Sequence, residues 1–401
     1  MSKSNQEKST NSLGSFINYK QVVMTLANDL NRLKSFSNKL NLSKSIELID
    51  TILEKIRTES FSLAIVGEFN RGKSKLINAL LGQEILPSDV LPTTATLNRV
   101  IFGMTPSVKV VFKDGSQKEV PIKELKQYVT KLTVESEKKA SSIQEVILQY
   151  NVEYCRNNVQ IFDTPGLNEH GDMDELTISI LPYVDAAILV MSAQAPFAKS
   201  EQNFLETHLL SSDLGRVIFI VNRIDDHSPE EASRIISYVE KRIKEYVLDR
   251  AEEEYGKESP EYHKYIKTIG RPKVFGISAL KALKGKEANQ VDLLAESRFP
   301  LFEKALEQFL TQDRAAILLQ VPVNRIISSS TEIISTINME ENALKMSVEQ
   351  FQQSYDIGVA EIEGIRKRKK AEMELINKAA ENVRYRVCLL YTSDAADEKV
   401  R

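Results

Sequence analysis

A short loop between an apolar run and a helix-like run carries the residues best suited to bind phosphate. Residues 67–74 read GEFNRGKS, which matches the spacing G-x-x-x-x-G-K-[ST]. Glycines let such a loop point its backbone N–H groups at phosphates, and the start of the next helix adds positive potential. We expect Lys73 to contact the β- and γ-phosphates and Ser74 to ligate Mg²⁺. The phosphate-binding candidates are Gly67, Glu68, Phe69, Asn70, Arg71, Gly72, Lys73, Ser74 and Lys75.

A second motif indicates that the base of the nucleotide is guanine. The run VNRID, residues 221–225, places Asn222 and Asp225 at the spacing of the guanine-reading pattern N-K-x-D, with Arg223 where lysine is usual. A carboxylate can accept two hydrogen bonds from guanine that adenine cannot offer. The run GISAL follows later in the chain, and we expect the backbone of Ser278 and Ala279 to meet the guanine O6.

Two further motifs are placed to sense the γ-phosphate. The run VQIFDTPG puts Asp163 at the end of a predicted strand, where it suits a water-mediated Mg²⁺ contact. The backbone N–H of Gly166 suits the γ-phosphate. Upstream, LPTTAT supplies Thr93 and Thr94, either of which could complete the Mg²⁺ shell, and we favour Thr94. Loops that a γ-phosphate holds and hydrolysis releases form a two-state switch.

The elements that must position these residues follow an α/β pattern. Six short apolar runs alternate with helical segments and polar loops: FSLAIV, VKVVF, VQIF, AAILVM, RVIFIV and KVFGI. This pattern predicts an α/β domain with a mostly parallel sheet. The charged stretch 228–270 is predicted to be a helical insertion outside the sheet. Helix-like spacing at 14–58 predicts two helices, and 313–387 predicts one or two long amphipathic helices that need a partner for their apolar faces.

Composition excludes several classes of protein. The 401 residues are 27% charged with a net charge of −3, which argues against nucleic acid as a partner. The sequence has no apolar run long enough to suggest a membrane-spanning helix. Its two cysteines fit a reducing cytoplasm, and its four histidines show no metal-ligand spacing.

The last residues are unlike the rest of the chain. Residues 388–398, CLLYTSDAADE, resemble the translation of an adapter used in sequencing libraries, although a natural polar tail is the alternative. We therefore expect 388–401 to be non-native and the natural protein to continue beyond about residue 387. These residues are left out of the prediction of the fold.

Taken together, the motifs resemble those of bacterial dynamin-like proteins. The resemblance covers about residues 14–387, and its most specific parts are GEFNRGKS leading into LINALLG, ILPSDVLPTTA, FDTPGL and VNRID. The interval between Lys73 and Asp163 also exceeds that of a minimal Ras-like domain. The resemblance implies a P-loop GTPase domain at 59–310, N-terminal helices of a bundle or neck at 1–58, and the start of a bundle or stalk at 311–387.

Two residues of the loop bear on catalysis. Many dynamins carry a glutamine that positions the attacking water, but this chain has Phe69 at the matching position. Asn70 or a backbone group could take that role instead. Arg71 could act as an arginine finger within a dimer, although a phosphate-facing or surface role is equally open.

The resemblance implies a Mg²⁺-dependent GTPase that pairs through its GTPase domains and remodels membranes by fusion, fission or repair. Expected partners are a second copy, a second dynamin-like protein and membrane lipid, with GTP and GDP as ligands. The expected location is cytoplasmic, peripheral at the inner face of the plasma membrane. The alternatives are a monomeric switch GTPase that acts on a protein or ribosomal partner, and a nucleotide-binding scaffold with little turnover.

Overall fold

The computed structural model describes residues 3–88, 96–129, 142–167, 171–346, 350, 352–353 and 355–368. The chain divides into two compact units, Met1–Ser330 and Thr331–Arg401. The first unit contains the sheet and every predicted site residue that the structure describes. The predicted Thr93 and Thr94, and the predicted tail at 388–401, lie outside the described residues.

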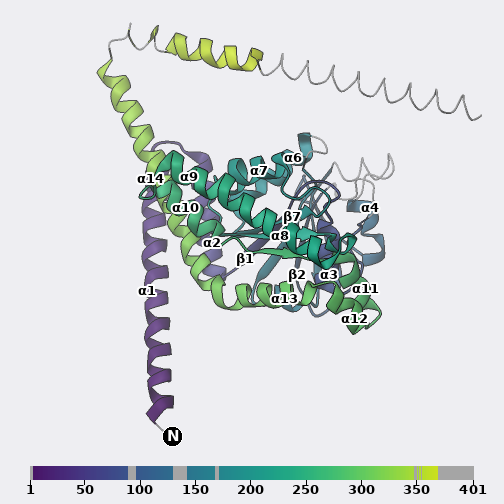
Figure 1. Cartoon of the computed structure of the whole chain (residues 1–401). Coiled ribbons are helices and arrows are strands. Elements are labelled where there is room, and N and C mark those ends of the chain that lie inside the picture. The colour runs from purple at the N-terminus through teal and green to yellow at the C-terminus, as the bar shows by residue number, and fades with distance from the viewer. Residues whose placement is uncertain are drawn as a thin grey trace, which may run out of the picture. The chain divides into compact units, whose positions relative to one another are not determined.

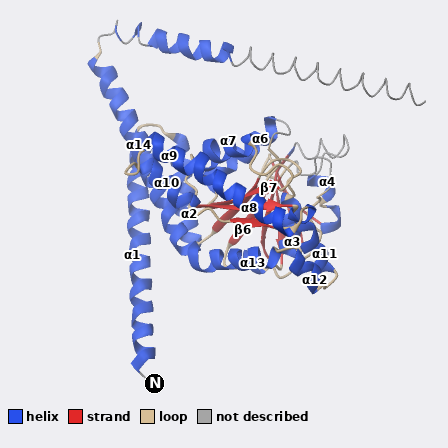
Figure 2. Cartoon of the chain, viewed as in Figure 1, coloured by secondary structure: helices blue, strands red, loops and turns tan. Residues whose placement is uncertain are grey.

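A nine-stranded sheet forms the centre of the first unit (Figure 2). Its strand order is β4-β3-β5-β2-β6-β1-β7-β8-β9. The strands are β1 (Phe61–Val66), β2 (Leu97–Phe102), β3 (Ser107–Phe112), β4 (Gln117–Val120), β5 (Ile143–Tyr150), β6 (Val159–Asp163), β7 (Ala186–Ser192), β8 (Arg216–Asn222) and β9 (Val274–Gly276).

The half of the sheet that carries the motifs is parallel. Strand β1 pairs in parallel with β6 and β7, and β8 pairs in parallel with β7 and β9. Strand β2 runs antiparallel to β6 but parallel to β5. Alternate residues of β1 enter the hydrophobic cores on the two faces of the sheet, Leu63 on one face and Ala64 on the other. Burial on both faces explains the continuous apolar runs, and the predicted mostly parallel α/β fold is confirmed.

Helices cover the sheet and flank it in the chain (Figure 1). The α-helices are α1 (Lys3–Lys39), α2 (Ser43–Thr58), α3 (Lys73–Leu81), α4 (Lys126–Val129), α6 (Gly171–Ile180), α7 (Lys199–Phe204), α8 (Pro229–Ile243), α9 (Arg250–Tyr255), α10 (Pro260–Ile269), α11 (Ala279–Glu287), α12 (Val291–Glu296), α13 (Phe299–Gln308) and α14 (Arg314–Lys345). Three π-helical segments continue α7, α8 and α13: η4 (Leu205–Leu209), η6 (Lys244–Asp249) and η7 (Phe309–Asp313).

The predicted charged stretch at 228–270 is helical, and it helps to form the core. Helices α8 and α10 bury Val239, Ile243 and Ile269 in the core on one face of the sheet. The stretch, which lies between β8 and β9 in the chain, therefore packs its helices against one face of the sheet.

Helices from both ends of the first unit pack on the same core, as predicted for the flanking helices. Leu30 of α1 and Ile49 of α2 share a core cluster with Val321 of α14. The hydroxyls of Ser45 and Ser329 lie 3.2 Å apart and are buried. Residues 369–387 of the predicted bundle lie outside the described part of the chain. Within the described part, no helix is long and apolar enough to cross a membrane.

Strand direction brings the motifs to one edge of the sheet. The parallel strands β1, β6 and β8 end at Val66, Asp163 and Asn222. In an open α/β sheet, ligands bind beyond the carboxyl ends of the strands. The sheet thus places the predicted phosphate, magnesium and base motifs beside one another.

Candidate nucleotide-binding site

The loop from Gly67 to Gly72 forms a cradle between β1 and α3. Lys73 is the first residue of α3, and its side chain turns back over the loop. Its Nζ donates to the carbonyl oxygens of Gly67 and Glu68, over 3.0 and 3.1 Å. The Lys73 residue is only 7% exposed. The loop therefore holds a buried ammonium group at the N-terminus of a helix, which is an environment suited to phosphate.

Asn222, at the end of β8, ties three segments of the site together. Its Nδ2 donates to the carbonyl oxygen of Arg71 over 2.9 Å, and its Oδ1 accepts from the backbone N–H of Ala279 over 3.0 Å. The residue is buried. One amide thus sets the distance between the cradle and the loop that starts α11, where Ser278 is the N-cap.

The rest of the base-reading motif lies beside the cradle. Arg223 has a φ of 61° and donates to the backbone oxygen of Asn70 over 2.9 Å and to its Oδ1 over 2.6 Å. Asp225 follows in a short 3₁₀ turn and is exposed. The carboxylate of Asp225 is therefore accessible to a base, while Arg223 and Asn70 hold the two loops together.

Asp163 forms the centre of a buried polar cluster below the cradle. Its Oδ2 accepts from the Ser74 hydroxyl over 3.0 Å and from Asn98 Nδ2 over 3.4 Å. Thr96, in turn, donates to Asn98 Oδ1 over 3.3 Å. Among the described residues, Asp163 Oδ1 has no hydrogen-bond partner although it is buried. A hydroxyl, a carboxylate and an unsatisfied carboxylate oxygen are hard oxygen donors and fit Mg²⁺.

The environment of Asp163 should make stability depend on pH. Burial raises its pKa to about 6, although Lys73, Ser74 and Asn98 each lower it. In the unfolded chain the group loses its proton near pH 4, so the folded state holds a proton that the unfolded state releases. The contribution of Asp163 to stability is therefore present at acid pH and is lost as pH rises through about 6.

We expect Asp163→Asn to remove this part of the pH dependence. Chemical denaturation without nucleotide or Mg²⁺ should show wild-type unfolding free energy falling by an extra 2–3 kcal/mol or so between about pH 4 and pH 8, relative to the variant. The exposed Asp114→Asn variant is the control and should keep the slope. Equal slopes for wild type and Asp163→Asn would show that this carboxyl is not perturbed as described.

The segment predicted to sense the γ-phosphate is joined to the cradle. The backbone N–H of Phe69 donates to Leu167 O over 3.2 Å, and the N–H of Leu167 donates to Gly67 O over 3.3 Å. A Cβ on Gly166 would lie 2.6 Å from the Cα of Phe69. Only glycine permits this approach, so the packing of the segment against Phe69 requires Gly166 independently of any nucleotide.

Arg71 is held by two carboxylates instead of facing solvent. It forms an ion pair with Glu68, and its Nε donates to Glu201 Oε1 over 3.0 Å. Ser200 donates to Glu68. Glu201 and Ser200, at the start of α7, are absent from the sequence prediction. No motif could have revealed them, because they contact residues about 130 positions earlier in the chain.

The structure brings most of the predicted site residues together at this edge of the sheet. The cradle residues, Asp163, Gly166, Asn222, Arg223, Ser278 and Ala279 meet through the contacts above. The side chain of Lys75 instead pairs with Glu84 over 3.0 Å. The roles assigned to individual residues, including catalysis by Lys73, Thr94, Asn70 and Arg71, stay predictions.

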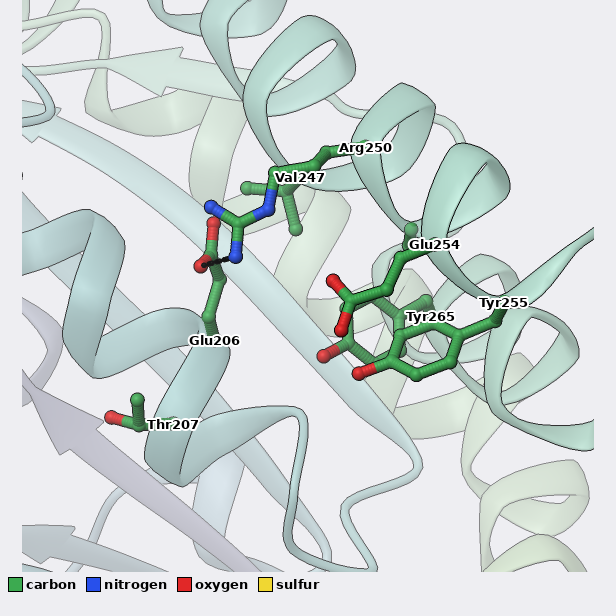
Figure 3. Close-up of a pocket in the computed structure, with 8 residues that line it drawn as sticks. Glu206, Thr207, Val247, Arg250, Glu254, Tyr255 and Tyr265 are labelled. Atoms are coloured by element: carbon green, nitrogen blue, oxygen red, sulfur yellow. Dashed lines mark ion pairs between the residues drawn. The ribbon is translucent and has the colours of Figure 1, made fainter.

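A separate pocket of about 190 Å³ lies among η4, η6, α9 and α10. Figure 3 shows Glu206 paired with Arg250 at one side of it, and Glu254, Tyr255 and Tyr265 at the other. The pKa of Tyr265 is raised to about 12, mainly by burial and to a smaller extent by Tyr255, Glu206 and Glu254. The pocket contains none of the predicted nucleotide-binding residues, so it is distinct from the cradle.

Comparison with known families gives a match over the part of the chain that holds the cradle. Residues 63–224 match the Dynamin family. The matched range begins in β1 and ends just after Asn222, so it includes the phosphate cradle, Asp163 and the first residue of the base-reading motif.

Individual relatives are similar over more of the chain. An uncharacterized protein encoded in the xynA 3′ region of Caldicellulosiruptor sp. (strain Rt8B.4) is 29% identical over 75% of this chain and 69% of its own length. The bacterial dynamin-like protein of Nostoc punctiforme is 26% identical over 86% of this chain and 50% of its own. The chain thus spans only half the length of the Nostoc protein.

Solved structures include an oligomerised bacterial dynamin pair described as sensing and tethering membranes over long range. One chain of it aligns with 90% of this chain and 54% of its own length, with 20% identity and a TM-score of 0.49.

Proposed function

Because residues 63–224 of this chain match the Dynamin family, we propose that the chain binds GTP, hydrolyses it to GDP and phosphate, and pairs through its GTPase domain to remodel membranes. The observation that best supports this proposal is the buried Lys73 ammonium above the Ser74–Asp163 pair, at the end of three parallel strands. The base-reading loop lies against the same cradle through Asn222.

In the proposed reaction the chain mainly positions and stabilises charge. Lys73 and the backbone N–H groups of the cradle bind the phosphates, where charge develops during phosphoryl transfer. Asp225 accepts the two guanine hydrogen bonds. The Ala279 N–H donates to Asn222 Oδ1 in this structure, so it must exchange that partner to meet the guanine O6. Asn70 Oδ1 already accepts one hydrogen bond from Arg223, so Asn70 would have to orient water with its second lone pair or its Nδ2 group.

We infer that Mg²⁺ accompanies the nucleotide. Ser74 and Asp163 would hold it, and the free Oδ1 of Asp163 supports this assignment. Thr94, which lies outside the described residues, is the proposed third ligand. When bound, the ion would neutralise charge on the β- and γ-phosphates.

We also infer that the GTPase domain pairs with a second copy, or with a second dynamin-like chain, when GTP is bound. The match of residues 63–224 to the Dynamin family supports this inference. The proposed location is cytoplasmic, peripheral at the inner face of the plasma membrane, with membrane lipid as a proposed partner.

The test is GTP turnover per molecule as a function of protein concentration, with ATP measured in parallel. We expect specific activity to rise with concentration, because paired domains would complete each other's active sites. We expect GTP to be preferred over ATP by about 5- to 150-fold, which corresponds to the 1–3 kcal/mol of a bidentate base contact.

Each other outcome contradicts a defined part of the proposal. Turnover per molecule that is independent of protein concentration would favour a monomeric switch GTPase. Binding without turnover would favour a scaffold. A preference for ATP would contradict the assignment of Asp225 as the base reader.

A further inference from the structure

Arg71 forms a small polar cluster with Glu68, Ser200 and Glu201, and we call these four residues the arginine cage. The Arg71 side chain is only 16% exposed, and that of Glu201 is fully buried. The guanidinium pairs with Glu68 from its own loop and with Glu201 from the first turn of α7. The cage therefore joins the phosphate cradle to a helix that follows β7.

Glu201 contacts both the cradle and the start of α7. Its Oε1 accepts from Arg71 Nε over 3.0 Å, and its Oε2 accepts from the backbone N–H of Ala198, the N-cap of α7, over 2.8 Å. The Ser200 hydroxyl donates to Glu68. Two adjacent residues of α7 thus contact both members of the Glu68–Arg71 pair.

We propose that Glu201 is a positioning residue that withholds Arg71 from the phosphate groups of GTP. This inference rests on the proposed GTPase function. Carboxylate and phosphate bind the same donor fork of a guanidinium, so Arg71 cannot engage a phosphate fully while it stays in the cage. Opening the Arg71–Glu201 pair frees the guanidinium to stabilise charge that develops on the phosphates.

The charge state of Glu201 supports this role. The pKa of the Glu201 carboxyl is raised to about 7 because burial, with a smaller contribution from Glu68, outweighs the lowering by Arg71 and the Ala198 N–H. Arg71 and Glu68 are the charged groups that face it. The carboxyl is thus charged above about pH 7 and becomes neutral below it. The cage should consequently be tight on the alkaline side and loose on the acid side.

The test compares wild type with Glu201→Gln, which keeps an acceptor for the Ala198 N–H but loses the charge. GTP turnover is measured at low protein concentration between about pH 6 and pH 8.5. We expect kcat of Glu201→Gln to exceed that of wild type by about 3- to 10-fold at the alkaline end. The ratio should approach one at the acid end, because the wild-type carboxyl is then neutral too.

Glu231→Gln is a matched control, since Glu231 accepts from the N-cap backbone of α8 over 3.0 Å but is exposed, whereas Glu201 is buried against Arg71. Its activity ratio to wild type should stay near one throughout. In an Arg71→Ala background, Glu201→Gln should change nothing. A gain that persists without Arg71, or a ratio that does not change with pH, would overturn the proposal.

Two further arms complete the experiment. Binding of fluorescent GDP reports whether α7 and the cradle are folded. If Glu201→Gln fails to bind GDP, Glu68→Gln opens the cage from the other side, and this variant must then raise kcat itself.

Varying protein concentration shows whether the phosphate that Arg71 contacts belongs to its own nucleotide or to that of a second copy. A gain in kcat at all dilutions means that Arg71 acts on the nucleotide bound to its own chain. A gain that appears only at concentrations where chains pair means that Arg71 acts on the nucleotide bound to a second copy. Wild type without GTP binding or turnover would refute the proposed function itself, and not this inference alone.

Discussion

Replacement of Lys73 by alanine should lower GTP turnover by about 10²–10³-fold, the loss typical of removing one preorganised charge-stabilising donor. The ammonium lies over the cradle, 3.0 Å from Gly67 O and 3.1 Å from Glu68 O, and is almost fully buried. A charge at such a site is screened little by water, so its loss costs more than the loss of a surface charge. Lys73 also lowers the pKa of Asp163, so the variant should hold the Asp163 proton to higher pH.

The measurement is steady-state GTP turnover together with binding of fluorescent GDP. Lys241→Ala removes the same charge from the exposed face of α8, where Lys241 pairs with Glu245, and serves as the control. We expect the control to match wild type. A Lys73→Ala variant that is folded and turns over GTP at more than a tenth of the wild-type rate would contradict the role of Lys73.

Replacement of Gly72 by alanine should weaken guanine nucleotide binding by about 100-fold or more, which corresponds to roughly 3 kcal/mol. Gly72 has a φ of 89°, and an added Cβ would lie 2.3 Å from Asn222 Nδ2. That amide is hydrogen-bonded to Arg71 O and to the N–H of Ala279. Alanine must therefore either distort the cradle or displace Asn222, which separates the phosphate loop from the base-reading loop.

Gly115→Ala is a matched control for the backbone part of this effect. Gly115 has a φ of 83°, close to that of Gly72, but a Cβ there would meet nothing within 4 Å. Both variants thus carry the left-handed backbone cost of about 1–2 kcal/mol, and only Gly72→Ala carries the collision. Titration with fluorescent GDP and thermal unfolding should show lost stability in both and lost binding in one. Unchanged affinity in Gly72→Ala would show that the cradle can relax around Asn222.

Much of the fold could be read from the sequence because burial on both faces of a sheet leaves a continuous apolar signal. All six predicted runs are strands of the sheet: β1, β3, β6, β7, β8 and β9. The three strands that were missed, β2, β4 and β5, contain charged or polar residues along their length. Strand β4 has one buried residue, Val120, so its side chains carry almost no apolar pattern.

The residues of the candidate site likewise fall into some that the sequence predicted and some that it did not. The cradle and the base-reading motif are contiguous, and each needs particular residue types at fixed spacing, so both were visible in the sequence. Asn98 and Thr96 were not, because they support Asp163 from a neighbouring strand and follow no spacing rule. The dual role of Asn222, which holds the cradle as well as the α11 loop, also depends on which strand ends beside the cradle.

The sequence alone therefore determined the α/β class, and it predicted the phosphate loop, the guanine motif and the resemblance to dynamin-family GTPases, because each of these depends on short runs of neighbouring residues. Only the tertiary structure decided what Arg71 contacts. Strand β7 lies beside β1, and this pairing brings the start of α7 against the cradle, so a carboxylate about 130 residues away buries itself against the guanidinium. Burial of a charge requires a partner of opposite charge, and the fold, not the motif, supplies that partner.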